Sequence, residues 1–250
     1  MSELRVIPAT FKKNFKSEDL QMSLTESINY GDVRKSLSPS YIMKHFSIQD
    51  IDTDIPENWK GVALTFPAAT LVFDLAGSSV SIRERGAKDY VIQNQEIFSE
   101  LTQIIYSQEG IIEKFPGDGI SAHFPLFIEE SIDLPITRAF VSMCKIINFL
   151  EQEQSMRRNQ FRFTLTYGKD TIITKFGGEK HQELISIGHA VNLAHKLEKN
   201  VKNKGCFIGI DEICYPYCSD SIKLRVEEYN LESNLRRIVT TEEKWYGVKY

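Results

Sequence analysis

The chain has 250 residues, with 30 Lys and Arg against 34 Asp and Glu, which gives a formal charge of −4. Hydrophobic residues make up 42% of the chain and charged residues 26%, so a wholly disordered protein is excluded. The mildly acidic balance argues against a nucleic-acid partner held by bulk positive charge. No apolar run approaches the roughly 20 residues of a membrane span, so we expect no membrane partner. The start, MSELRVIPATFKK, has no apolar signal core, and we therefore expect a cytoplasmic protein.

The four cysteines are too few and too scattered for a disulfide framework in a chain of this length. Cys214 and Cys218 have the spacing of half a zinc site, but no second Cys or His pair follows at a suitable distance. We therefore expect reduced, structural thiols.

The pattern divides the chain into an N-terminal arm over residues 1–66 and a larger domain over residues 67–250. The arm is polar and rich in turn-forming residues, with one short helix expected over Tyr41–Phe46 after Ser40. It contains no residues with catalytic spacing, and we expect it to pack on the domain or on a partner subunit.

In the larger domain the patterns predict strands and helices in a regular order. The first expected elements are a buried strand over Ala69–Leu75, a helix over Asp89–Ser107 and a hairpin of Ile111–Phe115 and Ile120–Phe124. They are followed by a helix over Ser131–Glu151, a strand over Phe161–Tyr167 paired with Thr171–Phe176, a helix over His189–Lys199, a strand over Cys206–Ile210 and a β-rich tail ending at Tyr250. The inward residues are expected to be Val91, Phe98, Leu101 and Ile105 on the first helix and Phe140, Val141, Cys144, Ile147 and Leu150 on the second. The order β-α-β-β-α-β predicts an α+β fold with a ferredoxin-like core and additional strands and helices.

Two acidic residues stand where this core would bring them together. Asp74 ends the first strand, and Asp118 lies at the tip of the hairpin. These two segments are neighbours in a ferredoxin-like sheet, so the carboxylates can converge. Two converged carboxylates repel unless a cation neutralises them, and Mg²⁺ or Mn²⁺ takes oxygen ligands of this kind. Taken singly, each residue is equally an ordinary strand-end or turn Asp.

The four residues after Asp74 and Leu75 are small. Backbone N–H groups of Ala76, Gly77, Ser78 and Ser79 could face the oxygens of a phosphate. The strand end therefore has the features of a site for a phosphorylated ligand.

Three blocks of the sequence, FDLAGSS, KFPGDGISAHF and ISIGHAVNLAHKLE, resemble the signature blocks of class III nucleotidyl cyclases over about residues 69–200. The resemblance implies that Asp74 and Asp118 hold two Mg²⁺ or Mn²⁺ ions, with the Leu75 carbonyl as a further ligand. It also implies that Asn192 orients the ribose, and that Lys196 stands where the family usually has a transition-state arginine. Lysine lacks the bidentate fork of arginine. The family forms its sites between two subunits, so the resemblance implies a homodimer with two equivalent sites at the interface.

The chemistry of cyclisation fits such a site. The ribose 3′-oxygen attacks the α-phosphate in line and expels pyrophosphate. Bound divalent ions lower the pKa of the 3′-hydroxyl and neutralise the phosphates, and Lys196 can supply a cation for the growing charge.

The same resemblance implies that two positions recognise the base of the substrate. Lys114 stands four residues before Asp118, as in adenylate cyclases, but Ile185 stands seven residues before Asn192, where those enzymes have an acidic residue. Isoleucine cannot accept a hydrogen bond from an exocyclic amino group. The chain thus resembles the free-standing bacterial pyrimidine cyclases of anti-phage defence, which implies UTP first and CTP second as substrate.

Two other interpretations stay open. One is an adenylate cyclase with a relaxed base pocket, and the other is a nucleotide-sensing domain that has lost turnover. A diguanylate-cyclase-like palm shares the topology, but the hairpin lacks a GGDEF-type sequence.

Overall fold

The computed structural model describes residues 47–50, 62–127, 130–178, 181–233, 235 and 242–250. The expected helix over Tyr41–Phe46 lies outside these residues. None of the described helices is long and apolar enough to cross a bilayer.

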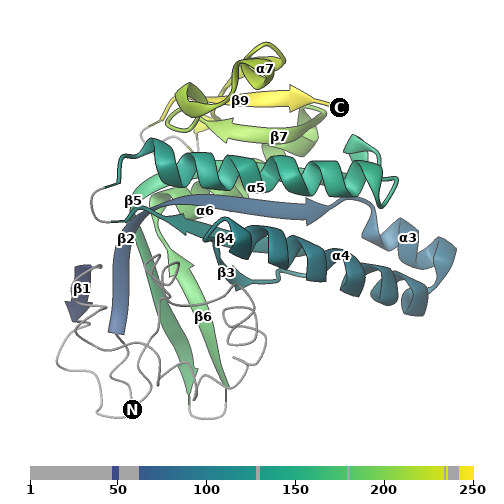
Figure 1. The fold of residues 1–250 in the computed structure, drawn as a ribbon, viewed down its shortest axis with the longest axis horizontal. Coiled ribbons are helices and arrows are strands. Elements are labelled where there is room, and N and C mark those ends of the chain that lie inside the picture. The colour runs from purple at the N-terminus through teal and green to yellow at the C-terminus, as the bar shows by residue number, and fades with distance from the viewer. Residues whose placement is uncertain (1–46, 51–61, 128–129, 179–180, 234, 236–241) are drawn as a thin grey trace.

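The described part of the chain forms one mixed sheet of nine strands with helices packed on it (Figure 1). The strands are β1 (Ser47–Asp50), β2 (Val62–Leu75), β3 (Ile111–Lys114), β4 (Gly119–Pro125), β5 (Phe161–Gly178), β6 (His181–Ile187), β7 (Cys206–Asp211), β8 (Val226–Asn230) and β9 (Lys244–Lys249). The helices are α3 (Ser78–Arg85), α4 (Ala87–Ser107), α5 (Asp133–Gln152), α6 (His189–Asn203) and α7 (Asp220–Lys223), with 3₁₀ turns η5 (Arg158–Gln160) and η6 (Tyr215–Tyr217). The strand order is β3-β4-β2-β5-β7-β9-β8, with β1 paired to β2 and β6 paired to β5.

The ferredoxin-like core is confirmed by this order. Strands β2, β3, β4 and β5 are the four strands of the β-α-β-β-α-β unit, and they lie side by side as β5-β2-β4-β3, all antiparallel. The α+β class with additional elements is therefore correct.

Helices cover both faces of the core sheet, as the alternation along β5 shows. Phe163 and Leu165 point into the main core under α4 and α5, the helices in front of the sheet in Figure 1. Thr164 and Thr166 point the other way, and their hydroxyls donate to carbonyls of α6 at 2.9 Å. Since successive side chains of a strand alternate between faces, α6 covers the opposite face.

The same alternation on β2 directs Asp74. Phe73 is buried in the main core, with its ring centroid 5.1 Å from that of Phe163 and 6.3 Å from that of Phe98. This aromatic cluster fixes the end of β2, so the next side chain, Asp74, faces the α6 side.

Several expected elements differ in detail from the observed ones. β2 begins at Val62, seven residues before the expected strand. Thr171–Phe176 does not form a separate partner strand, because it continues β5. This later part of β5 pairs with β6, and the Phe161–Tyr167 part pairs with β2 and β7. The helix α3 was not expected at all.

The prediction of which residues point inward is partly wrong for two helices. On α5, Cys144 is exposed while Val141 and Ile147 are half-buried, because the inward stripe is Ile136, Ala139, Met143, Ile146 and Leu150. On α4, Val91 is 52% exposed because the first turns of the helix extend past the core, and Ile97 is buried instead.

Candidate active site

The structure brings the two predicted carboxylates to one place. Asp74 is the second-last residue of β2 and pairs in register with Gly119, the first residue of β4, so it lies beside the turn that carries Asp118. The Leu75 N–H donates to the Asp118 carbonyl at 3.2 Å, which ties the turn to the strand end. The negative charge of Asp118 also raises the pKa of Asp74, as expected for neighbouring carboxylates.

An arginine and a third carboxylate complete this cluster. Arg162 of β5 lies directly across from Asp74, and its guanidinium makes an ion pair with that carboxylate. The same guanidinium lies 3.2 Å from the Glu198 carboxylate on α6. The patterns of the sequence did not single out Arg162 or Glu198, although a charged residue inside an expected buried strand was a signal for Arg162.

The cluster carries more negative than positive charge. Three carboxylates, those of Asp74, Asp118 and Glu198, meet one guanidinium, that of Arg162. Burial, then Glu198, and to a lesser extent Asp118 raise the pKa of Asp74 to about 6, and Arg162 only partly offsets them. A divalent cation would relieve this surplus, so the donor set fits Mg²⁺ or Mn²⁺. Among the described residues no group of three or more His, Cys, Asp or Glu side chains forms a metal cage, so further ligands would come from a carbonyl such as that of Leu75 or from a substrate.

The chain turns sharply after Asp74. Gly77 has φ 84° and ψ 21°, a left-handed conformation that suits glycine, and it caps the start of α3. The Ala76 N–H donates to the Gln160 carbonyl at 2.7 Å, so this amide is engaged. Ser78 and Ser79 lie in the first turn of α3, where N–H groups lack partners within the helix. The amides that remain suited to phosphate oxygens are therefore those at Gly77, Ser78 and Ser79.

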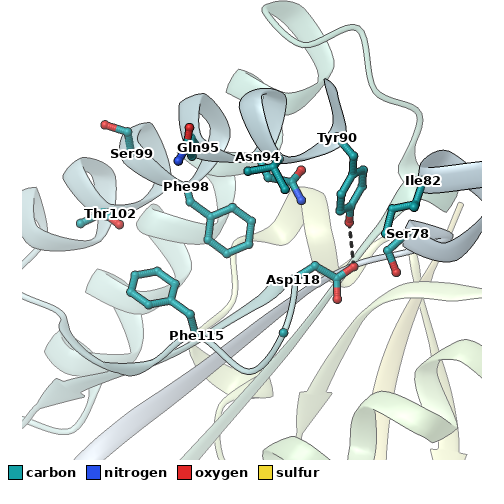
Figure 2. A pocket seen from close by; sticks show the side chains of 12 residues that line it. Ser78, Ile82, Tyr90, Asn94, Gln95, Phe98, Ser99, Thr102, Phe115 and Asp118 are labelled. Carbon is teal, nitrogen blue, oxygen red and sulfur yellow. Dashed lines mark hydrogen bonds between the residues drawn. The ribbon is translucent and has the colours of Figure 1, made fainter. Parts of the chain in front are cut away.

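A cavity of about 700 Å³ opens beside Asp118 (Figure 2). At one end the Tyr90 hydroxyl donates to the Asp118 carboxylate at 3.1 Å, next to Ser78. At the other end the rings of Phe98 and Phe115 face each other with centroids 5.8 Å apart. Tyr90 therefore holds the second carboxylate in place from α4, a role that sequence patterns did not indicate.

The two positions expected to read the base, Lys114 and Ile185, lie near one buried carboxylate, that of Glu113. Lys114 ends β3, and its Nζ lies 3.2 Å from Glu113 Oε1. The N–H of Ser186, the residue after Ile185, donates to the same oxygen at 2.8 Å. Lys114 and Ile185 are therefore held on either side of one carboxylate, although they are far apart in the sequence.

Asn192 and Lys196 lie one turn apart on α6, and both are exposed. Within the described residues no hydrogen bond or ion pair joins either of them to Asp74 or Asp118. The chain thus presents the paired carboxylates and, separately, an exposed Asn and Lys on a helix.

Of the four cysteines, three are buried, and all four are free thiols. Burial raises the pKa of Cys218 to about 12, so this thiol stays protonated. No disulfide joins Cys214 to Cys218, and the Cys218 thiol instead donates to the Cys214 carbonyl at 3.7 Å.

The fold is that of the adenylyl and guanylyl cyclase domains. A bacterial light-regulated adenylyl cyclase matches 98% of this chain and 66% of its own, with a TM-score of 0.58 and 18% identity. The adenylyl cyclase CyaB from P. aeruginosa matches 75% of this chain and 96% of its own, with a TM-score of 0.56 and 16% identity. The guanylyl cyclase Cya2 matches 74% of this chain and 92% of its own, with a TM-score of 0.53 and 19% identity. No protein-family model and no curated protein matches the sequence.

Proposed function

We propose that this protein is a metal-dependent nucleotide cyclase that converts a pyrimidine ribonucleoside triphosphate, UTP before CTP, into the 3′,5′-cyclic monophosphate and pyrophosphate. The observation that carries the proposal is the convergence of Asp74 and Asp118 in a cluster with surplus negative charge, on a fold shared with adenylyl and guanylyl cyclases.

The residues divide into two sets with different tasks. Asp74, Asp118 and the Leu75 carbonyl would hold Mg²⁺ or Mn²⁺, which activates the 3′-hydroxyl and neutralises phosphate charge when bound. Arg162 compensates Asp74 and Glu198 until such cations are present. The amides at Gly77, Ser78 and Ser79 would receive the triphosphate oxygens.

Asn192 and Lys196 supply the second set, from the partner subunit of a homodimer. Asn192 would orient the ribose, and Lys196 would place a positive charge near the α-phosphate as pyrophosphate leaves. Both side chains are exposed on α6, as an intersubunit role requires.

The preference for a pyrimidine rests on Lys114 and Ile185. Together they offer a donor and an apolar surface, with no acceptor from Ile185 for the amino group of adenine. A purine cyclase is the second candidate, favoured by the adenylyl and guanylyl cyclases among the structural neighbours.

The test is incubation of the protein with each of the four ribonucleoside triphosphates and Mn²⁺, followed by separation of the products by mass. We expect cyclic UMP as the main product, and Asp74→Ala should abolish it. Cyclic AMP or cyclic GMP as the sole product would contradict the pyrimidine assignment. The absence of any cyclic product would contradict the proposal that the protein is a cyclase. A role in antiviral defence predicts a rise of that product in infected cells.

A further inference from the structure

A buried polar network lies directly behind Lys114. The Glu113 side chain is completely buried, and both of its oxygens are engaged. Oε1 accepts the Ser186 N–H at 2.8 Å and lies 3.2 Å from Lys114 Nζ. Oε2 accepts the Ser121 hydroxyl at 2.9 Å and lies 3.3 Å from His123 Nε2.

The network extends to two further elements. His123 Nδ1 lies 3.1 Å from the Thr70 hydroxyl on β2. The Ser121 hydroxyl lies 3.4 Å from Nε2 of His195 on α6, the helix that carries Asn192 and Lys196. One carboxylate of β3 is therefore joined, directly or through one residue, to β2, β4, β6 and α6.

Glu113 is ionised in this setting. Burial alone would raise its pKa, but the hydrogen bond and charge of His123 and the hydrogen bonds from Ser186 outweigh burial, so the pKa lies well below its ordinary range. A buried ion cluster of this kind contributes little stability over well-packed apolar side chains of similar volume. Its position between the two base-reading residues gives it another use.

We propose that Glu113 is a positioning residue for base selection, which fixes Lys114 and the Ile185–Ser186 backbone in one arrangement; this inference rests on the proposed cyclase function. A carboxylate offers about four lone-pair positions. Four groups already fill them, those of Ser186, Lys114, Ser121 and His123. Glu113 therefore contacts the base only through Lys114.

The consequence is a base site with a fixed donor and no acceptor. Lys114 is 43% exposed, so its ammonium can point out of the network toward a ligand. Ile185, the residue before the Ser186 N–H that binds the same carboxylate, offers only apolar surface. Uracil presents carbonyl oxygens and no exocyclic amino group, whereas cytosine and adenine would leave an amino group unpaired there. The network thus selects UTP over CTP and ATP.

The experiment is a double-mutant cycle on selectivity. The KM and kcat for UTP, CTP, ATP and GTP are measured with Mn²⁺ for the wild type, Glu113→Gln, Lys114→Ala and the double variant. Loss of one base contact predicts a rise of about tenfold in KM for UTP, a lower ratio of UTP to CTP turnover, and kcat within about threefold of the wild type. The double variant should match Lys114→Ala, because Glu113→Gln keeps an acceptor for the Ser186 N–H and alters only the ion pair with Lys114.

Two further variants separate positioning from folding. Glu113→Ala should lower the selectivity more than Glu113→Gln, whose amide oxygen still accepts from Ser186 but has no negative charge to hold the Lys114 ammonium. Asp211→Asn is the matched control: Asp211 is fully buried and accepts the N–H groups of Tyr167 at 2.8 Å and Cys214 at 2.7 Å. It lies on β7, with β4, β2 and β5 between it and β3, so it should lower stability and leave the UTP to CTP ratio unchanged.

The outcomes are distinct. Two results would overturn the inference: a folded Glu113→Gln protein with wild-type KM and selectivity, or a double variant whose losses add. In either case UTP turnover by the wild type would still support the proposed function. A wild type that cyclises none of the four triphosphates would overturn the proposed function, and the inference with it.

Discussion

Asp74 is the residue on which the electrostatics of the site depend. Its carboxylate lies in the same cluster as two other carboxylates and one guanidinium, and its pKa is raised to about 6, by burial first and Glu198 second. The sequence placed Asp74 and Asp118 correctly at a strand end and a hairpin tip. It could not show that Arg162 and Glu198 lie beside Asp74, because their proximity depends on the register of β5 and on the docking of α6.

The raised pKa predicts a pH-dependent metal affinity. Protons compete with Mn²⁺ for Asp74, so the affinity should be constant above pH 7 and fall as pH drops through about 6. Well below that pKa the fall should approach about tenfold per pH unit. Calorimetric titration with Mn²⁺ between pH 5 and 8 measures it. The control is Asp170→Asn, which alters a carboxylate paired with His189 outside the cluster and should leave the pH dependence of Mn²⁺ affinity unchanged. A wild-type affinity that does not change with pH would contradict the prediction.

The ion pair between Arg162 and Asp74 leads us to expect that the stability of an Arg162 variant depends on pH. In Arg162→Met the pKa of Asp74 rises further, since the guanidinium that lowers it is gone. A pKa raised above the unfolded value gives stability that is present in acid and lost as pH rises through the folded pKa. The loss in free energy of unfolding of the variant, relative to the wild type, should therefore grow from pH 5 to pH 8. We expect about 2 kcal/mol at pH 8, less than the roughly 3–5 kcal/mol for a fully buried pair, because Asp74 keeps contact with water.

Urea denaturation at pH 5 and pH 8 checks this prediction. Arg158→Met is the matched control, because Arg158 pairs with Glu151 near the surface, at 2.6 Å, and such pairs contribute about 1 kcal/mol or less. Equal deficits for Arg162→Met at both pH values would show that Asp74 does not sense the arginine.

At the scale of elements, the β3–β4 hairpin sets the distance between the two carboxylates. A Cβ added at Gly119 would lie 2.6 Å from the Phe73 carbonyl oxygen, which is backbone and cannot move aside. Gly119→Ala should therefore push the turn from β2, lower stability by about 1–3 kcal/mol, and weaken Mn²⁺ binding. Gly117→Asn is the control, because a Cβ there meets open space and Asn tolerates its φ of 65°. Normal Mn²⁺ binding by Gly119→Ala would contradict this role of the hairpin.

The elements also show where sequence patterns succeed and fail. The ferredoxin-like order could be predicted, because strands and helices of the core have clear apolar periods. The continuous strand β5 and its pairing with β6 could not, because a strand of 18 residues is rare and the sequence pattern instead predicts two short strands, Phe161–Tyr167 and Thr171–Phe176. On α5 the apolar residues form a stripe wide enough for two orientations, and only contact with the sheet decides which side is inward.

At the scale of the molecule, the proposed site needs two subunits. Asp74 and Asp118 would come from one and Asn192 and Lys196 from the other. Mixing an inactive Asp74→Ala protein with an inactive Asn192→Ala protein should then restore activity. With random exchange, half of the dimers are mixed and each has one intact site, so about a quarter of wild-type activity should return. No recovery after verified exchange would contradict sites between subunits.

The central claim is that Asp74 and Asp118 hold divalent cations together. Electron paramagnetic resonance of free Mn²⁺ measures this directly, in the wild type, Asp74→Asn, Asp118→Asn and the double variant. Each single variant should bind Mn²⁺ much more weakly than the wild type, and the double variant should lose little more, because either carboxylate alone leaves the site incomplete. Wild-type Mn²⁺ binding by either single variant would contradict a shared site.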